Sequence, residues 1–187
     1  MIYLIRHAQS LTNIGHRISY PTAEVALTEE GQKQAQLLAD TFDISPDLIV
    51  YSSYLRARQS AEPLIKKFPL VKTEEWEVAR EVHFLSTKAY QNTSKEERKK
   101  MINDNFETYG LDYVMGAGAE SFNQVVSRAE VFLEKMRTLP EHQNTVIFSH
   151  GGIIKILNMI LAGKERTMEN AFNVPGIKNG QIFELKF

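Results

Sequence analysis

The chain of 187 residues contains no cysteine. This absence excludes disulfide bonds, thiolate nucleophiles, and zinc or iron–sulfur centres held by cysteine. The chain also lacks an excess of charge of either sign, because 22 Lys and Arg stand against 23 Asp and Glu for a formal net charge of -1. Nucleic acids and anionic membranes attract a basic surface excess, so neither is expected as a partner, and any basic site must be local.

A long apolar run is lacking too. The apolar residues 1–5 meet Arg6 and His7 at once, which makes this segment too short for a signal peptide or a membrane span. We therefore expect a cytoplasmic protein. Hydrophobic residues make up 43% and charged residues 24%, as in soluble globular proteins. The length suits one domain, so residues 1–187 are expected to form a single domain with one core.

Three segments share one design. Residues 2–5, 48–51 and 145–148 are apolar runs rich in β-branched side chains, and each precedes a short polar cluster and a helical pattern. This order is typical of parallel strands that feed crossover helices. The polar clusters contain Arg6 and His7, Arg56, and His150. Residues just past the carboxyl ends of such strands converge on the ligand crevice, so we expect these four side chains to meet.

Helical patterns separate these strands. Thr28 with two following glutamates begins one helix, and residues 54–67 and 122–136 carry apolar stripes at helical spacing. Residues 181–185 follow an Asn-Gly turn and predict a late antiparallel strand at a sheet edge. The expected fold class is α/β, a three-layer α/β/α sandwich around a mostly parallel sheet.

Residues 85–117 are expected to leave the sheet as an excursion. Ser94 and Glu97 form a capping box that opens a polar helix. Such insertions often act as lids over a pocket. A surface helix packed through Met101, Ile102 and Phe106 explains the same pattern equally well.

His7 is the first candidate for chemistry. A neutral imidazole is a competent nucleophile towards phosphorus, and nearby Arg6 and Arg56 would keep it neutral by like-charge repulsion. The same guanidinium groups can bind a phosphate dianion through paired donors. Asn13 and His150 can add further donors. A single histidine at a strand end is more often structural, so the prediction depends on the whole set.

A leaving alkoxide also needs a proton donor. Glu81, with apolar neighbours in residues 79–84, is the candidate. By spacing alone it is no better than the other acidic residues, and a surface carboxylate paired with Arg80 is the alternative.

Five blocks, in order, resemble the motifs of the histidine phosphatase superfamily, also called the phosphoglycerate mutase-like family. They are Ile-Arg-His-Ala-Gln-Ser at 5–10 with Asn13, Leu-Thr-Glu-Glu-Gly-Gln-Lys-Gln-Ala at 27–35, Ser-Ser-Tyr-Leu-Arg-Ala-Arg-Gln-Ser-Ala-Glu at 52–62, Gly-Ala-Glu-Ser at 118–121 and Ser-His-Gly-Gly at 149–152. The resemblance covers residues 2–162 outside the excursion. A lone Arg-His pair would be weak, whereas five ordered blocks are specific.

The resemblance implies roles for the candidate residues. His7 would accept the phosphoryl group, and Glu81 lies where the family keeps its proton donor. The phosphate pocket would comprise Arg6, Asn13, Arg56 and His150. His16 and Arg17 lie in a loop where the family sometimes places a substrate-contacting base, although a solvated loop explains them equally well.

The resemblance further implies a small-molecule phosphate monoester as substrate, with neither a metal nor another cofactor. Ala8 replaces the usual glycine of the first motif, and residues 83–86 lack the glycines and tryptophan common there. The wall on the substrate side is therefore not transferable from the family.

Three other functions compete with a phosphatase. A mutase would return the phosphoryl group from His7 to a bound sugar-acid phosphate, but the chain lacks the longer segments of such mutases. A zinc hydrolase would use His7, His150 and Glu81, but two arginines beside a dication oppose it and no HExxH spacing occurs. A non-catalytic phosphate-binding module would use the same pocket. The natural substrate and the oligomeric state are not legible from the sequence.

Overall fold

A five-stranded sheet forms the centre of the fold. The computed structural model describes residues 1–91 and 93–187, and its strands run in the order β3-β2-β4-β1-β5. They are β1 (Ile2–Arg6), β2 (Leu48–Tyr51), β3 (Lys72–Glu75), β4 (Thr145–Ser149) and β5 (Ile182–Leu185). β1, β2, β3 and β4 are parallel, and β5 pairs antiparallel with β1 at the edge. The three predicted parallel strands and the late antiparallel edge strand are confirmed.

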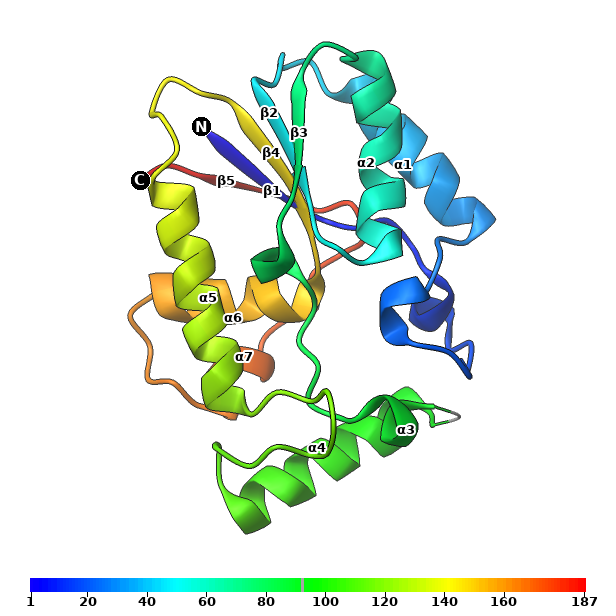
Figure 1. Ribbon diagram of the computed structural model, residues 1–187, viewed down its shortest axis with the longest axis vertical. Coiled ribbons are helices and arrows are strands. Elements are labelled where there is room, and N and C mark those ends of the chain that lie inside the picture. The colour runs from blue at the N-terminus through cyan, green and yellow to red at the C-terminus, as the bar shows by residue number, and fades with distance from the viewer. Residues whose placement is uncertain (92) are drawn as a thin grey trace.

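Helices cover both faces of this sheet, as Figure 1 shows. Strand side chains alternate between two cores. Tyr3 and Ile5 point to the core shared with α1 (Glu29–Thr41) and α2 (Leu55–Lys67), whereas Ile2 and Leu4 point to the core shared with α5 (Phe122–Arg137) and α6 (Gly151–Leu161). The predicted three-layer α/β/α arrangement is therefore confirmed. The helices are α1 (Glu29–Thr41), α2 (Leu55–Lys67), α3 (Thr87–Tyr90), α4 (Lys95–Tyr109), α5 (Phe122–Arg137), α6 (Gly151–Leu161) and α7 (Met168–Phe172).

The predicted helix starts follow local capping. Thr28 accepts a hydrogen bond from the Gly31 N–H at the start of α1, and Ser94 and Ser121 each form a capping box at α4 and α5. Side-chain caps satisfy N–H groups that the first helical turn leaves unpaired. The starts at Thr28 and Ser94 could be predicted because capping depends only on neighbouring residues, whereas the helix after Ser121 was predicted from its apolar stripe.

Strand β3 was not predicted. Its sequence, Lys-Thr-Glu-Glu, has no apolar alternation, and its side chains are mostly exposed. It pairs through its backbone with β2 at the sheet edge, where charged side chains discourage pairing with other chains.

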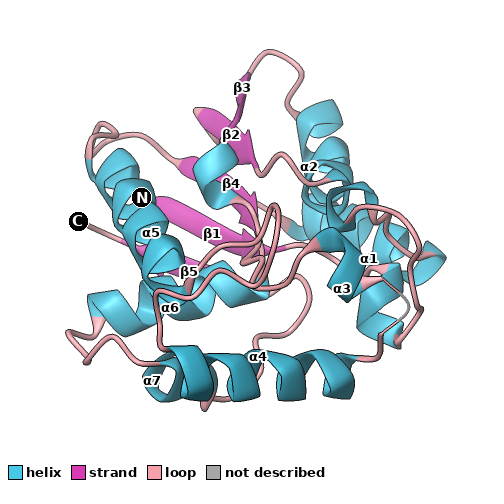
Figure 2. Cartoon of the chain, turned by 60° about the horizontal axis from the view of Figure 1, so that its bottom comes forward, coloured by secondary structure: helices cyan, strands magenta, loops and turns pink. Residues whose placement is uncertain are grey.

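The excursion leaves and rejoins the fold at one point. A bridge pairs Leu85 with Met115, and between them the chain forms α3 and α4. Phe106 of α4 is buried and contacts Phe84 edge to face, with the two ring centroids 5.3 Å apart. Figure 2 shows α4 lying across the end of the fold where the parallel strands finish. The contacts of a packed surface helix are thus present, while motion of this segment as a lid stays a prediction.

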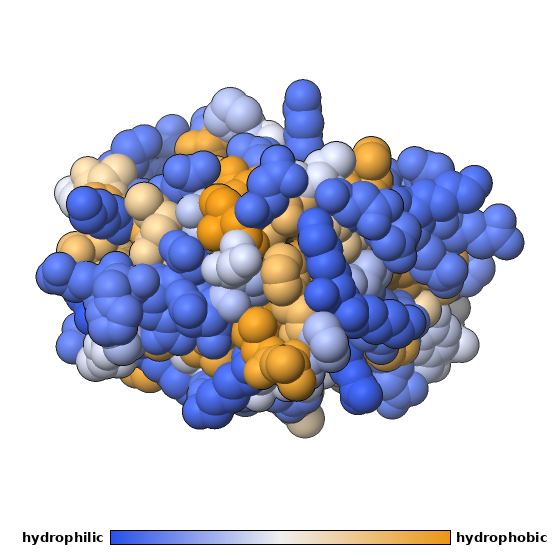
Figure 3. Space-filling model, turned by 90° about the horizontal axis from the view of Figure 1, so that it is seen from above, coloured by the Kyte–Doolittle hydropathy of each residue, from blue (hydrophilic) through white to orange (hydrophobic). Residues whose placement is uncertain are grey.

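The face opposite α4 is mostly hydrophilic, and apolar side chains reach it in small groups (Figure 3). Scattered exposed apolar residues of this kind are normal on globular proteins. Over the described residues, the structure contains no helix with the length and apolar character needed to cross a membrane.

Candidate active site

The carboxyl ends of β1, β2 and β4 bring four predicted residues together. Arg6 ends β1 and His7 follows it, Arg56 lies in the first turn of α2, and His150 precedes α6. The His7 and His150 ring centroids are 5.1 Å apart, and Arg56 Nε lies 3.1 Å from His7 Nε2. The predicted convergence of His7 with Arg56 and His150 is confirmed.

The tautomer of His7 is set by its two hydrogen-bond partners. Nδ1 lies 2.6 Å from the carbonyl oxygen of Ala8, which can only accept, so Nδ1 carries the proton. Nε2 accepts from Arg56 Nε, which can only donate. His7 is therefore a neutral ring with a lone pair on Nε2.

Burial and positive charge keep His7 neutral. The side chain is buried, and burial, followed by the charge of Arg56, lowers the pKa of His7 well below its usual value of 6.5. Arg6 acts in the same direction. The hydrogen bond to Ala8 opposes these effects but does not reverse them.

Ala8 accommodates its extra methyl group without disturbing this arrangement. It is buried against Leu27 and Ala35, and its N–H donates to Ser60 Oγ at 3.0 Å. The replacement of glycine in the first motif therefore leaves the Ala8 carbonyl in place to orient His7.

His150 is fully buried beside His7. Its Nε2 lies 2.8 Å from Ser52 Oγ, and its Nδ1 has no hydrogen-bond partner among the described residues. Burial and the neighbouring charge of Arg56 lower the pKa of His150 well below 6.5. A buried polar atom without a partner is costly, and this is the kind of position that a ligand satisfies.

Arg6 and Asn13 also keep donors unused. Arg6 donates through Nη1 to the Ile177 carbonyl, while its Nε has no partner within the described part of the chain. The Asn13 side-chain oxygen accepts from the Ser10 N–H, the Ser10 hydroxyl and Asn179. These three donors orient the Asn13 amide, so its NH₂ group remains the donor that can serve a ligand.

Glu81 lies at the amino end of α6. Its Oε1 accepts from the N–H groups of Val82 and Ile153 at 3.0 and 3.1 Å, and its Oε2 accepts from the Gly152 N–H at 3.2 Å. A Cβ at Gly152 would lie 2.4 Å from Glu81 Oε1, so the Glu81 carboxyl group can occupy this position only because residue 152 is a glycine. The alternative pairing of Glu81 with Arg80 is wrong, because Arg80 instead pairs with Glu77 and Glu120.

A buried ion-pair network holds the backbone that precedes Glu81. Glu120 binds Arg80 at 2.7 Å and Arg128 at 2.8 Å. Arg128 also donates to the carbonyl groups of Val78, Arg80 and Glu81. The sequence placed Glu120 in a motif but offered no sign of Arg128, because its partners are distant in sequence and become neighbours only on folding.

One cleft of about 480 Å³ collects most of the predicted site. Its lining includes Arg6, His7, Asn13, Arg56 and Glu81. His150 lies behind His7 and is not part of this lining.

The loop residues lie elsewhere. His16 and Arg17 are exposed and do not line the cleft, and Arg17 is 3.8 Å from Glu97 of α4. Among the described residues, no three His, Asp or Glu side chains are grouped to hold a metal ion.

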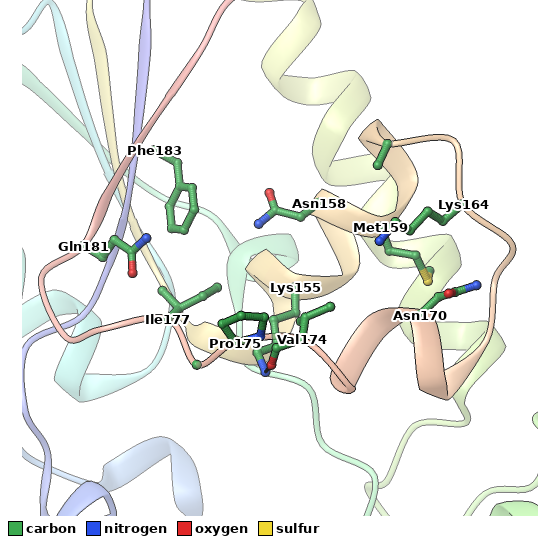
Figure 4. A pocket seen from close by; sticks show the side chains of 12 residues that line it. Lys155, Asn158, Met159, Lys164, Asn170, Val174, Pro175, Ile177, Gln181 and Phe183 are labelled. Carbon is green, nitrogen blue, oxygen red and sulfur yellow. Dashed lines mark hydrogen bonds between the residues drawn. The ribbon is translucent and has the colours of Figure 1, made fainter.

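A second cavity, of about 360 Å³, lies beside the cleft between α6, α7 and residues 174–177 (Figure 4). Asn158, Met159 and Phe183 are among its lining residues, and Lys155 lines both hollows. None of the predicted catalytic side chains reaches this second cavity.

The match to a family model decides the classification. The model described as "Histidine phosphatase superfamily (branch 1)" matches residues 2–187. The chain belongs to the histidine phosphatase superfamily. The family resemblance predicted from five sequence blocks is thus confirmed, and the matched region includes the excursion.

Proteins of similar sequence match most of this chain. The sequence is 31% identical over 159 residues to a 6-phosphofructo-2-kinase/fructose-2,6-bisphosphatase of Caenorhabditis elegans, covering 82% of this chain and 32% of that one. It is 27% identical to a metal-independent phosphoserine phosphatase of Arabidopsis thaliana, covering 83% and 66%. The chain thus spans about a third and just under two thirds of these relatives.

The fold agrees with solved structures. The alpha-ribazole phosphatase of Shigella flexneri superposes with a TM-score of 0.75 at 22% identity, covering 97% of this chain and 87% of that one. At this identity the likeness concerns the fold, and it confirms the predicted fold class.

Proposed function

We propose that this protein is a phosphatase that hydrolyses small phosphate monoesters through a phosphohistidine at His7. The observation that carries the proposal is the buried, neutral His7, whose protonated Nδ1 faces the Ala8 carbonyl and whose Nε2 meets Arg56 in a cleft. A ring in this state has a nucleophilic lone pair ready without losing a proton first.

The first step is transfer of the phosphoryl group. Nε2 of His7 attacks phosphorus in line, the N–P bond forms, and the P–O bond to the leaving group breaks. The phosphoryl oxygens take over the Arg56 donor that now meets Nε2, together with donors of Arg6 and Asn13, which line the same cleft. Donors already in place for the charge that develops on these oxygens lower the barrier.

The leaving alkoxide takes a proton from Glu81 in this mechanism. Among the described residues Oε2 accepts from one N–H, that of Gly152, so a lone pair remains for the proton. After transfer, the three N–H donors at the amino end of α6 stabilise the carboxylate. The carboxylate then takes a proton from the water that attacks the phosphohistidine, which releases inorganic phosphate and restores both groups.

The experiment is turnover of p-nitrophenyl phosphate together with trapping of the phosphoenzyme. We expect an acid-labile, alkali-stable phosphoprotein in quenched mixtures, and loss of turnover by at least about 10⁴-fold in His7→Ala. The exposed His142→Ala is the matched control and should turn over like the unmodified protein. Chelator should leave the rate unchanged.

Two results would overturn the proposal. Undiminished turnover in His7→Ala would remove the nucleophile, and phosphate binding without turnover of any ester would indicate a binding module. Incubation with 3-phosphoglycerate and a trace of 2,3-bisphosphoglycerate separates a mutase, since rapid formation of 2-phosphoglycerate would contradict hydrolysis as the main reaction.

A further inference from the structure

Beyond the phosphate-binding residues, the cleft is lined by cations. Lys95, Arg98 and Lys99 of α4 and Lys155 of α6 all line it, whereas Glu81 is the single acidic residue in the lining. The chain as a whole has a net charge of -1, so this concentration of positive charge is local.

Three of the four cations of α4, Lys95, Arg98 and Lys99, lie on the side of the helix that faces the cleft. Lys95, Lys99 and Ile102 are spaced by four and three residues, which places them on the same face, and all three line the cleft. Lys100, one position on, does not line the cleft and pairs with Asp104 at 2.5 Å. Lys95 and Lys99 thus face the cleft, whereas Lys100 lies on another face of α4 and is paired with an acidic residue.

Arg98 already has a structural role. Its guanidinium stacks over the Tyr90 ring at 4.2 Å and donates to the Thr93 carbonyl. Lys95, Lys99 and Lys155 differ, because within the described residues none of them is in an ion pair. These three ammonium groups remain to meet a ligand.

Lys155 is the best fixed of the three. Its Nζ donates to the Val174 carbonyl at 3.3 Å, and Figure 4 shows it beside Val174 and Pro175. Burial, and next the charge of Lys95, lower its pKa from the usual 10.5. Bringing ammonium groups together in a partly desolvated cleft is unfavourable, and a bound anion removes the penalty.

Apolar side chains also line this cleft. Phe84, Ile102 and Phe172 contribute to the lining, beside the arginines near His7 and the three lysines. A volume of about 480 Å³ suits a small organic molecule. The cleft therefore combines a phosphate-transfer site, an apolar wall and a second cationic group.

We propose that the ester hydrolysed at His7 carries a second anionic group, a phosphate or a carboxylate, that Lys95, Lys99 and Lys155 bind. This inference rests on the proposed phosphatase function and names its substrate class. The second anion orients the ester in the cleft, so it raises kcat/KM for substrates whose length spans the two positions.

The test is a panel of esters on the same carbon chain. At several matched lengths, kcat/KM is measured for an alkyl phosphate, the corresponding carboxyalkyl phosphate and the alkanediol bisphosphate. We expect at least one length at which a doubly anionic ester exceeds the alkyl phosphate by about tenfold or more, from the summed effect of ion pairs with the exposed Lys95 and Lys99 and the half-buried Lys155. Comparison of the two doubly anionic series tells a phosphate from a carboxylate.

Lysine variants assign the effect to this cluster. The ratio of kcat/KM between the doubly anionic ester and the alkyl phosphate should fall about threefold in Lys155→Gln and approach one in Lys95→Gln/Lys99→Gln/Lys155→Gln. Lys100→Gln removes the same charge from another face of α4 and should keep the full ratio.

A binding measurement keeps the inference testable without turnover. The same esters are titrated into His7→Ala by calorimetry, with and without the three lysine changes. Tighter binding of the doubly anionic ester that disappears with the lysines supports the inference. Equal Kd values across the panel overturn it while leaving the phosphatase proposal intact, whereas selective binding without turnover in the unmodified protein overturns the phosphatase proposal alone.

Discussion

At the scale of single residues, two neutral histidines are packed among positive charges. Burial and Arg56 lower the pKa of both His7 and His150 well below 6.5. The native protein therefore leaves both rings unprotonated at a pH where the unfolded chain protonates them. Well above pH 6.5 the two rings are neutral in both states and do not alter the free energy of unfolding. As the pH falls below about 6.5, the unfolded chain binds protons that the native protein does not, so the free energy of unfolding declines.

This difference predicts the response to acid. Between pH 7.5 and 5.5, the free energy of unfolding should fall by roughly 1 kcal/mol for each of the two histidines that stays neutral. Urea unfolding at the two pH values measures it, and His7→Gln/His150→Gln should lose less over the same interval. Since the nucleophile stays neutral, kcat/KM should show no inflection near pH 6.5 once the titration of the substrate phosphate, whose second pKa is about 6, has been divided out. A further loss of activity on the acid side, centred at that pH, would contradict an unprotonated His7.

Gly152 is the second prediction at this scale. In Gly152→Ala, the new methyl group would overlap Glu81 Oε1 and the Val82 side chain, so the carboxyl must leave its seat. We expect kcat for an alkyl phosphate to fall about 100-fold, the usual effect of losing a general acid, with a melting temperature within a few degrees of the parent.

The matched control for Gly152 is Gly176→Ala. A Cβ there meets nothing within 4 Å, so activity and melting temperature should stay unchanged. Equal kcat in the two variants would mean that Glu81 does not need its position at α6.

At the scale of elements, α5 fixes the segment that presents Glu81. Arg128 joins the buried Glu120 to three carbonyl groups between Val78 and Glu81. Burial raises the pKa of Glu120, but hydrogen bonds and charge from Arg128 and Arg80 outweigh it and lower the pKa overall. Glu120 is therefore a buried carboxylate that depends on its partners.

Removal of Arg128 should damage both stability and activity. Arg128→Leu leaves the buried Glu120 carboxylate short of one partner, and we expect the free energy of unfolding to fall by about 3–5 kcal/mol. The loss of the carbonyl contacts should also lower kcat, since Glu81 is no longer held. Denaturant titration and steady-state kinetics measure the two effects.

A double substitution separates these two effects. Glu120→Gln/Arg128→Leu removes the uncompensated charge, so it should regain part of the stability while kcat stays low. Recovery of both quantities together would show that Arg128 acts on catalysis only through folding.

At the scale of the whole molecule, the fold comprises a sheet domain and one excursion. The excursion is closed by the Leu85–Met115 bridge and docks through Phe106 on Phe84. Lys95 and Lys99 of the excursion line the same cleft as His7 and Arg56. In the proposed mechanism, substrate orientation and phosphoryl transfer thus depend on different parts of the chain.

Phe106→Ala tests how independent these parts are. Loss of a buried phenylalanine should reduce the local opening free energy of α4 by about 3 kcal/mol, while β1 and β4 keep their protection. Hydrogen exchange resolves the two regions, and Tyr109→Ala, at an exposed position of the same helix, serves as the control. Equal loss of protection in α4 and in the sheet would show one cooperative unit.

Much of the fold could be predicted because its signals are local. Apolar runs at 2–5, 48–51 and 145–148 predict strands, Thr28 and Ser94 predict helix starts, and polar residues after parallel strands predict the meeting of His7, Arg56 and His150. The ordered motifs then indicated the family. Strand β3 escaped prediction because backbone pairing with β2, and not its own side chains, makes it a strand.

The sequence by itself determined the layers of the fold, the strand ends that carry the polar residues, and the superfamily. Only the tertiary structure decided the tautomer of His7, the seat of Glu81 on α6, its support by Arg128, and which lysines face the cleft. The physical reason is range. Periodicity and capping act between neighbours in the chain, whereas burial, charge and hydrogen bonds in the site arise between residues that only packing brings together.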